Sequence, residues 1–84
     1  MIPLTLLGGS TVLRFRLREL MAEKQFQEGR RVTLEEVATA TGIHRTTLSK
    51  LQNVKGYNTT TDVLDRLCAF FDCEIQDLVQ RVRE

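Results

Sequence analysis

The chain has 84 residues, of which 42% are hydrophobic and 27% charged, and its formal net charge is +1. A chain this short has room for one hydrophobic core, so we expect a single domain. Its composition is that of a folded globular protein and not of a disordered chain. The near-neutral charge excludes nucleic-acid binding driven by total charge, so any attraction to phosphate depends on where the charges lie.

The sequence predicts neither a signal peptide nor a membrane span. Its longest apolar run near the N-terminus, residues 2–7, contains Pro3 and Thr5 and follows no basic residue. We therefore expect a cytoplasmic protein with no membrane contact. Cys68 and Cys73 are five residues apart and the one histidine is His44, which is not the spacing of a zinc site. We interpret both cysteines as small buried hydrophobic residues and expect no metal and no cofactor.

Residues 1–12 are interpreted as an N-terminal arm, and residues 13–84 as the domain. In the arm an apolar segment, Ile2 to Leu7, is followed by Gly8, Gly9 and Ser10, which end any regular element. Three interpretations of this segment stay open: a short strand that pairs with another chain or with a loop, a hydrophobic strap over the core, or residues left from cloning.

Five helices and no sheet are predicted for the rest of the chain. Apolar residues at positions 13, 17, 20 and 21 form a stripe that predicts a first helix from Leu13 to about Gln27, before Gly29. The loop 53–60 contains turn-forming residues, and a fourth helix follows from Thr60 or Thr61 to about Asp72. A last stripe, residues 75, 78, 79 and 82, predicts a fifth helix, with Arg81 and Arg83 at its C-terminal end.

The second helix has a clear start and a clear end. Thr33 and Glu36 match a capping box, in which each side chain bonds the backbone of the other residue, and Val32 and Val37 match a hydrophobic staple. Gly42 ends the helix. A third helix begins at His44 after a short turn. Two short helices joined in this way predict a helix-turn-helix unit.

Charge is distributed unevenly around this unit. No acidic residue occurs between Glu36 and Asp62, whereas the same stretch contains basic side chains: His44, Arg45, Lys50 and Lys55. Arg30 and Arg31 stand just upstream. The pattern predicts a local positive face despite the small net charge.

The segment Thr33 to Asn53, TLEEVATATGIHRTTLSKLQN, resembles the helix-turn-helix of the Cro and phage-repressor superfamily of bacterial regulators. The segment 60–82 is similar to the last two helices of that family. The resemblance implies an all-α, five-helix, lambda-repressor-like domain with its helix-turn-helix at 34–53. It also implies a transcriptional regulator, expected to be a repressor, that binds a double-stranded DNA operator, commonly as a homodimer on an inverted repeat.

Carried over by position, the resemblance implies that helix 44–52 reads the major groove. The residues expected at base edges are His44, Arg45, Thr46, Ser49 and Lys50. The residues expected at phosphates are Thr33, Thr47, Asn53, Lys55, Arg30 and Arg31. Arg45 leads the first set because its planar guanidinium matches O6 and N7 of guanine. Leu34 replaces the glutamine usual at the start of the second helix, so one polar contact with the DNA backbone is missing.

An enzyme is not expected, because the sequence has one histidine, no evident pair of carboxylates in a pocket and no nucleophile motif. The alternative to a regulator is an antitoxin or a protein-interaction module that uses the same fold, with DNA binding secondary. In that case the segment 2–7 or the last helix would contact a protein partner.

Overall fold

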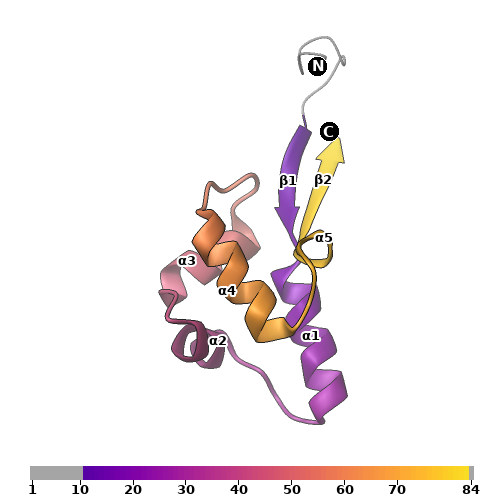
Figure 1. The fold of residues 1–84 in the computed structure, drawn as a ribbon, viewed down its shortest axis with the longest axis vertical. Coiled ribbons are helices and arrows are strands. Elements are labelled where there is room, and N and C mark those ends of the chain that lie inside the picture. The colour runs from indigo at the N-terminus through magenta and orange to yellow at the C-terminus, as the bar shows by residue number, and fades with distance from the viewer. Residues whose placement is uncertain (1–10, 84) are drawn as a thin grey trace.

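The structure, a computed structural model, describes residues 11–83 of the chain. Its elements in order are β1 (Thr11–Phe15), α1 (Leu17–Glu28), α2 (Leu34–Thr41), α3 (Arg45–Asn53), α4 (Thr61–Phe71), α5 (Ile75–Leu78) and β2 (Val79–Arg83). The helices form one body, from which β1 and β2 extend side by side as a two-stranded ribbon (Figure 1). The prediction of a mainly helical, five-helix domain is confirmed, whereas the expectation of no sheet is wrong. The segment 2–7, and with it the interpretation of the arm, lies outside the described residues.

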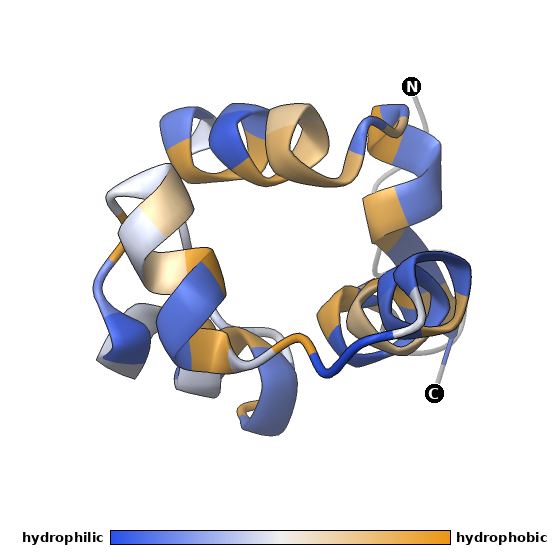
Figure 2. Ribbon diagram, turned by 90° about the horizontal axis from the view of Figure 1, so that it is seen from below, coloured by the Kyte–Doolittle hydropathy of each residue, from blue (hydrophilic) through white to orange (hydrophobic). Residues whose placement is uncertain are grey.

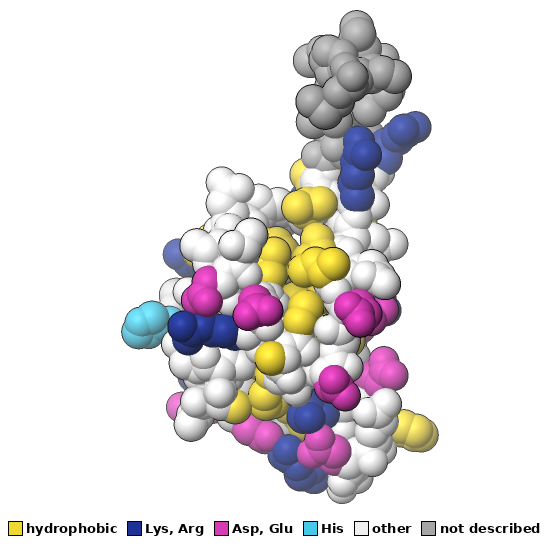
Figure 3. Space-filling model, viewed as in Figure 1, with side chains coloured by type: hydrophobic (Ala, Val, Ile, Leu, Met, Phe, Trp, Pro, Cys, Tyr) yellow, Lys and Arg dark blue, Asp and Glu magenta, His cyan; other side chains and the backbone are white. Residues whose placement is uncertain are grey.

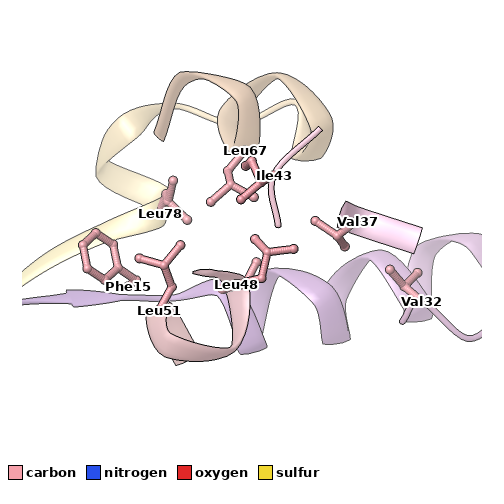
Figure 4. Packing of buried hydrophobic residues seen from close by; sticks show 9 residues of the cluster. Phe15, Val32, Val37, Ile43, Leu48, Leu51, Leu67 and Leu78 are labelled. Atoms are coloured by element: carbon pink, nitrogen blue, oxygen red, sulfur yellow. The ribbon is translucent and has the colours of Figure 1, made fainter. Parts of the chain in front are cut away.

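The core is built from hydrophobic side chains of β1, of all five helices, and of the segments that precede α2 and α3. Its buried residues are Phe15, Leu17, Val32, Val37, Ile43, Leu48, Leu51, Leu67 and Leu78. They converge between the helices and the base of the ribbon (Figure 4). Seen from below, the apolar segments of the helices turn toward this interior (Figure 2). Within the described residues no helix is both long and apolar enough to cross a membrane.

Both ends of the described chain differ from the predicted helices. Leu13 lies in β1 and is 50% exposed, so the first helix begins four residues later, at Leu17. The fifth helix ends at Leu78 after a single turn, and Arg81 and Arg83 lie in β2 instead of its last turn. The strands are antiparallel, with Leu13 opposite Arg81 and Phe15 opposite Val79.

Long-range pairing explains these corrections. The apolar spacing at both ends fits a helical stripe, but it also fits a strand, because the segments 11–15 and 79–83 contain β-branched and aromatic residues. Either strand alone would leave its backbone groups unpaired. Together they satisfy the N–H and C=O groups that face each other across the ribbon. Pairing also brings Phe15 into the core, where it is 9% exposed.

The predicted start of the second helix is confirmed, but only half of its capping box forms. The hydroxyl of Thr33 accepts a hydrogen bond from the N–H of Glu36 at 3.1 Å. The Glu36 carboxylate does not return to Thr33, because it accepts two hydrogen bonds from Arg30, each 2.7 Å long. Val32 and Val37 are both buried, as the staple predicts.

Other predicted boundaries agree with the structure. Gly29 follows α1, and Thr60 caps α4 by accepting from the N–H of Val63 at 3.2 Å. Cys68 and Cys73 are half-buried free thiols that pack against the core. Burial and the neighbouring Cys68 raise the pKa of the Cys73 thiol to about 11.

Two glycines end helices in the left-handed region, but their surroundings differ. Gly42 has φ of 76°, and a Cβ added there would lie 3.0 Å from the Nη1 atom of Arg66. That same nitrogen donates to the carbonyl of Thr41 at 3.0 Å. Gly29 has φ of 65°, and an added Cβ would meet nothing within 4 Å.

We therefore expect Gly42→Ala to destabilise the protein more than Gly29→Ala. Both changes add the cost of a side chain in the left-handed region, about 1–2 kcal/mol. Gly42→Ala additionally displaces the Arg66 guanidinium from Thr41. Urea unfolding of the two variants beside the parent protein gives the comparison. Equal losses would mean that Arg66 moves aside without cost.

Candidate nucleic-acid interface

Helix α3 has one buried and one exposed side. Leu48 and Leu51 are buried in the core. The five predicted contact residues Arg45, Thr46, Ser49, Lys50 and Asn53 are spaced by one, four, five and eight positions, so they share the opposite face. Among them Arg45, Thr46, Lys50 and Asn53 are exposed and Ser49 is half-buried. The structure thus brings four of the five predicted base-contacting residues, together with Asn53, onto one helix face.

The turn between α2 and α3 is fixed by hydrogen bonds that the sequence analysis did not predict. The Thr41 hydroxyl donates to the carbonyl of Val37 at 2.7 Å and accepts from the N–H of Ile43 at 3.2 Å. Arg66 of α4 donates to the Thr41 carbonyl. The buried turn and the buried Leu48 together set the direction of α3 relative to the rest of the domain.

The cationic side chains of α3 are available to solvent. His44 precedes the helix, is exposed, and projects from one edge of the molecule, where it is cyan in Figure 3. Arg45 is exposed. Within residues 11–83 its side chain forms no described hydrogen bond or ion pair. Lys50 lies over the ring of Tyr57, with its Nζ atom 5.9 Å from the ring centroid. Tyr57 therefore holds this ammonium group near the C-terminal half of the helix.

Asn53 is held at the end of this face by a residue of the first helix. The guanidinium of Arg18 donates to the Oδ1 atom of Asn53 at 2.9 Å, and the Asn53 amide donates to the Ser49 hydroxyl at 3.3 Å. Arg18 is exposed and adds a positive charge beside α3. No sequence signal identified it, because the two residues are 35 positions apart.

The second predicted group of contacts lies at the start of α2 and is more constrained. The Thr33 hydroxyl already caps the helix. Arg30 is held by two carboxylates, because it pairs with Glu36 and also donates from Nε to Glu28 at 2.9 Å. These hydrogen bonds raise the pKa of Arg30 and lower that of Glu36. Arg31 is exposed and its side chain has no described ion pair, so it is the more available cation of the two.

Two predicted residues lie at the margins of the α3 face. Thr47 is half-buried on the helix itself, and Lys55 is exposed in the loop that follows it. The described residues include no group of three or more histidine, cysteine or acidic side chains that could hold a metal ion.

The sequence model of the Cro/C1-type HTH DNA-binding domain matches residues 16–84. No curated protein matches the chain. The matched range begins at the residue before α1 and includes α2 and α3 with the whole candidate interface.

The Arg30–Glu36 pair predicts a pH-dependent contribution to stability. The pKa of Glu36 is lowered in the folded state, chiefly by its hydrogen bonds from Arg30. The contribution is therefore complete above the ordinary glutamate pKa of 4.5 and is lost as the pH falls through the lower, folded-state value. We expect Glu36→Gln to lower the free energy of unfolding at pH 7, and the difference from the parent protein to shrink in acid.

Glu35→Gln is the matched control, since Glu35 is the neighbouring carboxylate in the same helical turn and has no described ion pair. Denaturant unfolding at several pH values between 7 and 3 measures both variants. A deficit for Glu36→Gln that stayed constant with pH would contradict the assigned role of the ion pair.

Proposed function

This chain belongs to the Cro/C1-type helix-turn-helix DNA-binding family, and from that premise we propose that it is a sequence-specific transcriptional regulator that reads double-stranded DNA with α3. The observation that carries the proposal is the outer face of α3, where polar and cationic side chains stand opposite the buried Leu48 and Leu51. A major groove is wide enough to admit such a helix. The family match does not favour the alternative of a protein-interaction module.

The proposed base contacts follow from the chemistry of each side chain. Arg45 stands in the first turn of α3 and offers a planar pair of donors that fits O6 and N7 of guanine. Thr46 offers a methyl group to thymine as well as a hydroxyl. Lys50 and Ser49 follow one turn later, and His44 stands at the helix start. We rank Arg45 first, because none of its side-chain donors is engaged by a described residue.

The proposed phosphate contacts surround this face. Thr47 lies at the margin of the α3 face and Lys55 in the loop after the helix, and Asn53 closes the C-terminal end of α3 beside Arg18. At the start of α2, Arg31 and the free N–H groups near Thr33 favour an anion. Arg30 is placed last, because a phosphate would compete there with two carboxylates.

We also propose that the protein acts as a homodimer on an inverted repeat and represses transcription when bound there. Members of this family commonly bind in that form, and a twofold protein pairs with a palindromic site whose half-sites are about one helical turn apart. Selection of bound duplexes from a random library tests the specificity and the symmetry together. A set of selected sequences without any consensus would overturn sequence-specific reading, and a consensus without a repeat would overturn the dimer.

Two alanine variants separate base reading from phosphate binding. We expect Arg45→Ala to weaken binding to the selected site by about 1–3 kcal/mol and to relax the preference at one base pair. Lys55→Ala should weaken binding to selected and random duplexes alike, because a phosphate contact carries no sequence information. Titration of both duplexes with both variants measures the split. Equal losses on the two duplexes for both variants would refute these roles.

The salt dependence tests whether phosphates are contacted at all. The logarithm of the association constant should fall linearly with the logarithm of the salt concentration, because the basic side chains of the protein displace counterions from the DNA. Lys55→Ala should reduce this slope by about 1. An affinity that does not change with salt would exclude the proposed interface.

A further inference from the structure

Arg18 carries a charge that the described part of the fold does not neutralise. It stands in the first turn of α1, where the positive end of the helix dipole disfavours a cation. Two nearby arginines, Arg14 and Arg16, are both paired with Glu19. Within residues 11–83 Arg18 has no carboxylate partner, and the acceptor described for its guanidinium is the neutral amide oxygen of Asn53. Helix stability therefore gives no reason for an arginine at this position.

The hydrogen bond from Arg18 decides which way the Asn53 amide faces. A guanidinium has donors only, so the amide turns its oxygen toward Arg18. The amide nitrogen then lies toward α3, where one of its N–H groups donates to the Ser49 hydroxyl. Within residues 11–83 the second N–H has no described acceptor. Asn53 is thus left with a donor for an acceptor outside the chain, and Arg18 has further N–H groups of its own.

A hollow of about 500 Å³ lies beside this pair. Arg18, Asn53 and Lys55 supply polar groups to its lining. Its walls also include residues of both strands, among them Val12 of β1 and Val82 of β2, which provide apolar surface. The hollow therefore offers space for an anionic group next to two cations, with apolar surface for the carbon atoms that such a group carries.

We propose that Arg18 of α1 is part of the DNA interface, where it orients the Asn53 amide and, with that amide, binds one phosphate of the DNA backbone. The inference rests on the proposed function, since it assumes that α3 enters the major groove. Phosphate oxygens accept hydrogen bonds and donate none, which matches the donors of both side chains. Arginine suits this task better than lysine, because its planar fork can hold Asn53 with one N–H and keep others for the phosphate.

Replacing single phosphates of the selected duplex by uncharged methylphosphonates tests the contact. Several positions should weaken binding of the parent protein, and at one of them the loss of about tenfold should disappear in Arg18→Gln, which already lacks the charged partner. Arg14→Gln is the matched control. It removes an equal charge from an exposed arginine at the same hollow, but from one that Glu19 already neutralises. That variant should keep the tenfold loss.

A second set of titrations separates the orientation of Asn53 from the charge of Arg18. Arg18→Gln should reduce the salt slope by about 1, whereas Arg18→Lys should keep the slope and still bind more weakly, because an ammonium group lacks the fork. Arg18→Gln combined with Asn53→Ala should weaken binding by less than the product of the two single losses, since the two side chains act as one unit. Urea unfolding of each variant verifies that folded proteins are compared.

Three results would overturn the inference while the parent protein still binds its selected duplex. One is an Arg18→Gln protein with the affinity and salt slope of Arg14→Gln, because Arg18 would then act through total charge alone. Another is a methylphosphonate loss that persists at every position in Arg18→Gln. The third is single losses that multiply in the double variant, which would remove the orienting role. A parent protein that binds no duplex would instead refute the proposed function, and this inference with it.

Discussion

The reversal of the chain between α2 and α3 is the constraint on which the rest of the interface depends. Gly42 takes a backbone conformation that other residues resist, and Thr41 closes the turn through both its hydroxyl and its carbonyl. Because Ile43 and Leu48 are buried directly after it, α3 has one orientation available. The same packing that hides Leu48 and Leu51 therefore decides which side chains of α3 face outward.

A second constraint joins the two ends of the described chain. The ribbon places Phe15 in the core and connects it, through the Arg16 N–H, to the end of α5. Sequence periodicity could not predict this, because the apolar residues from Leu13 and from Ile75 fit a helical stripe as well as a strand. Both segments form strands because they pair with each other, and a local sequence pattern carries no information about pairing between segments far apart in the chain.

The candidate site could be predicted where its features depend on residues close to one another in the sequence. The Thr33 cap, the Gly42 turn and the outer face of α3 all follow from spacings of one to four residues. The contacts that the sequence did not reveal join residues with no periodic relation: Arg66 with Thr41, and Arg18 with Asn53. The Glu36 side chain illustrates the limit even at short range. Its spacing from Thr33 fits a capping box, but Arg30 offers two charge-assisted hydrogen bonds, which are stronger than one bond to a neutral N–H.

The ribbon also sets an order of events during synthesis. Arg14 and Gln80 face each other although they are 66 positions apart in the chain. The side-chain caps of α2 and α4 and the packing of α2 against α3 join residues close in sequence, so these contacts have their partners soon after they are made. β1, which is made first, has no β2 to pair with until residues 79–83 have been added. Throughout that interval Phe15 lacks the position that pairing gives it, so the nascent domain exposes an aromatic side chain and an open strand edge until its last described element is complete.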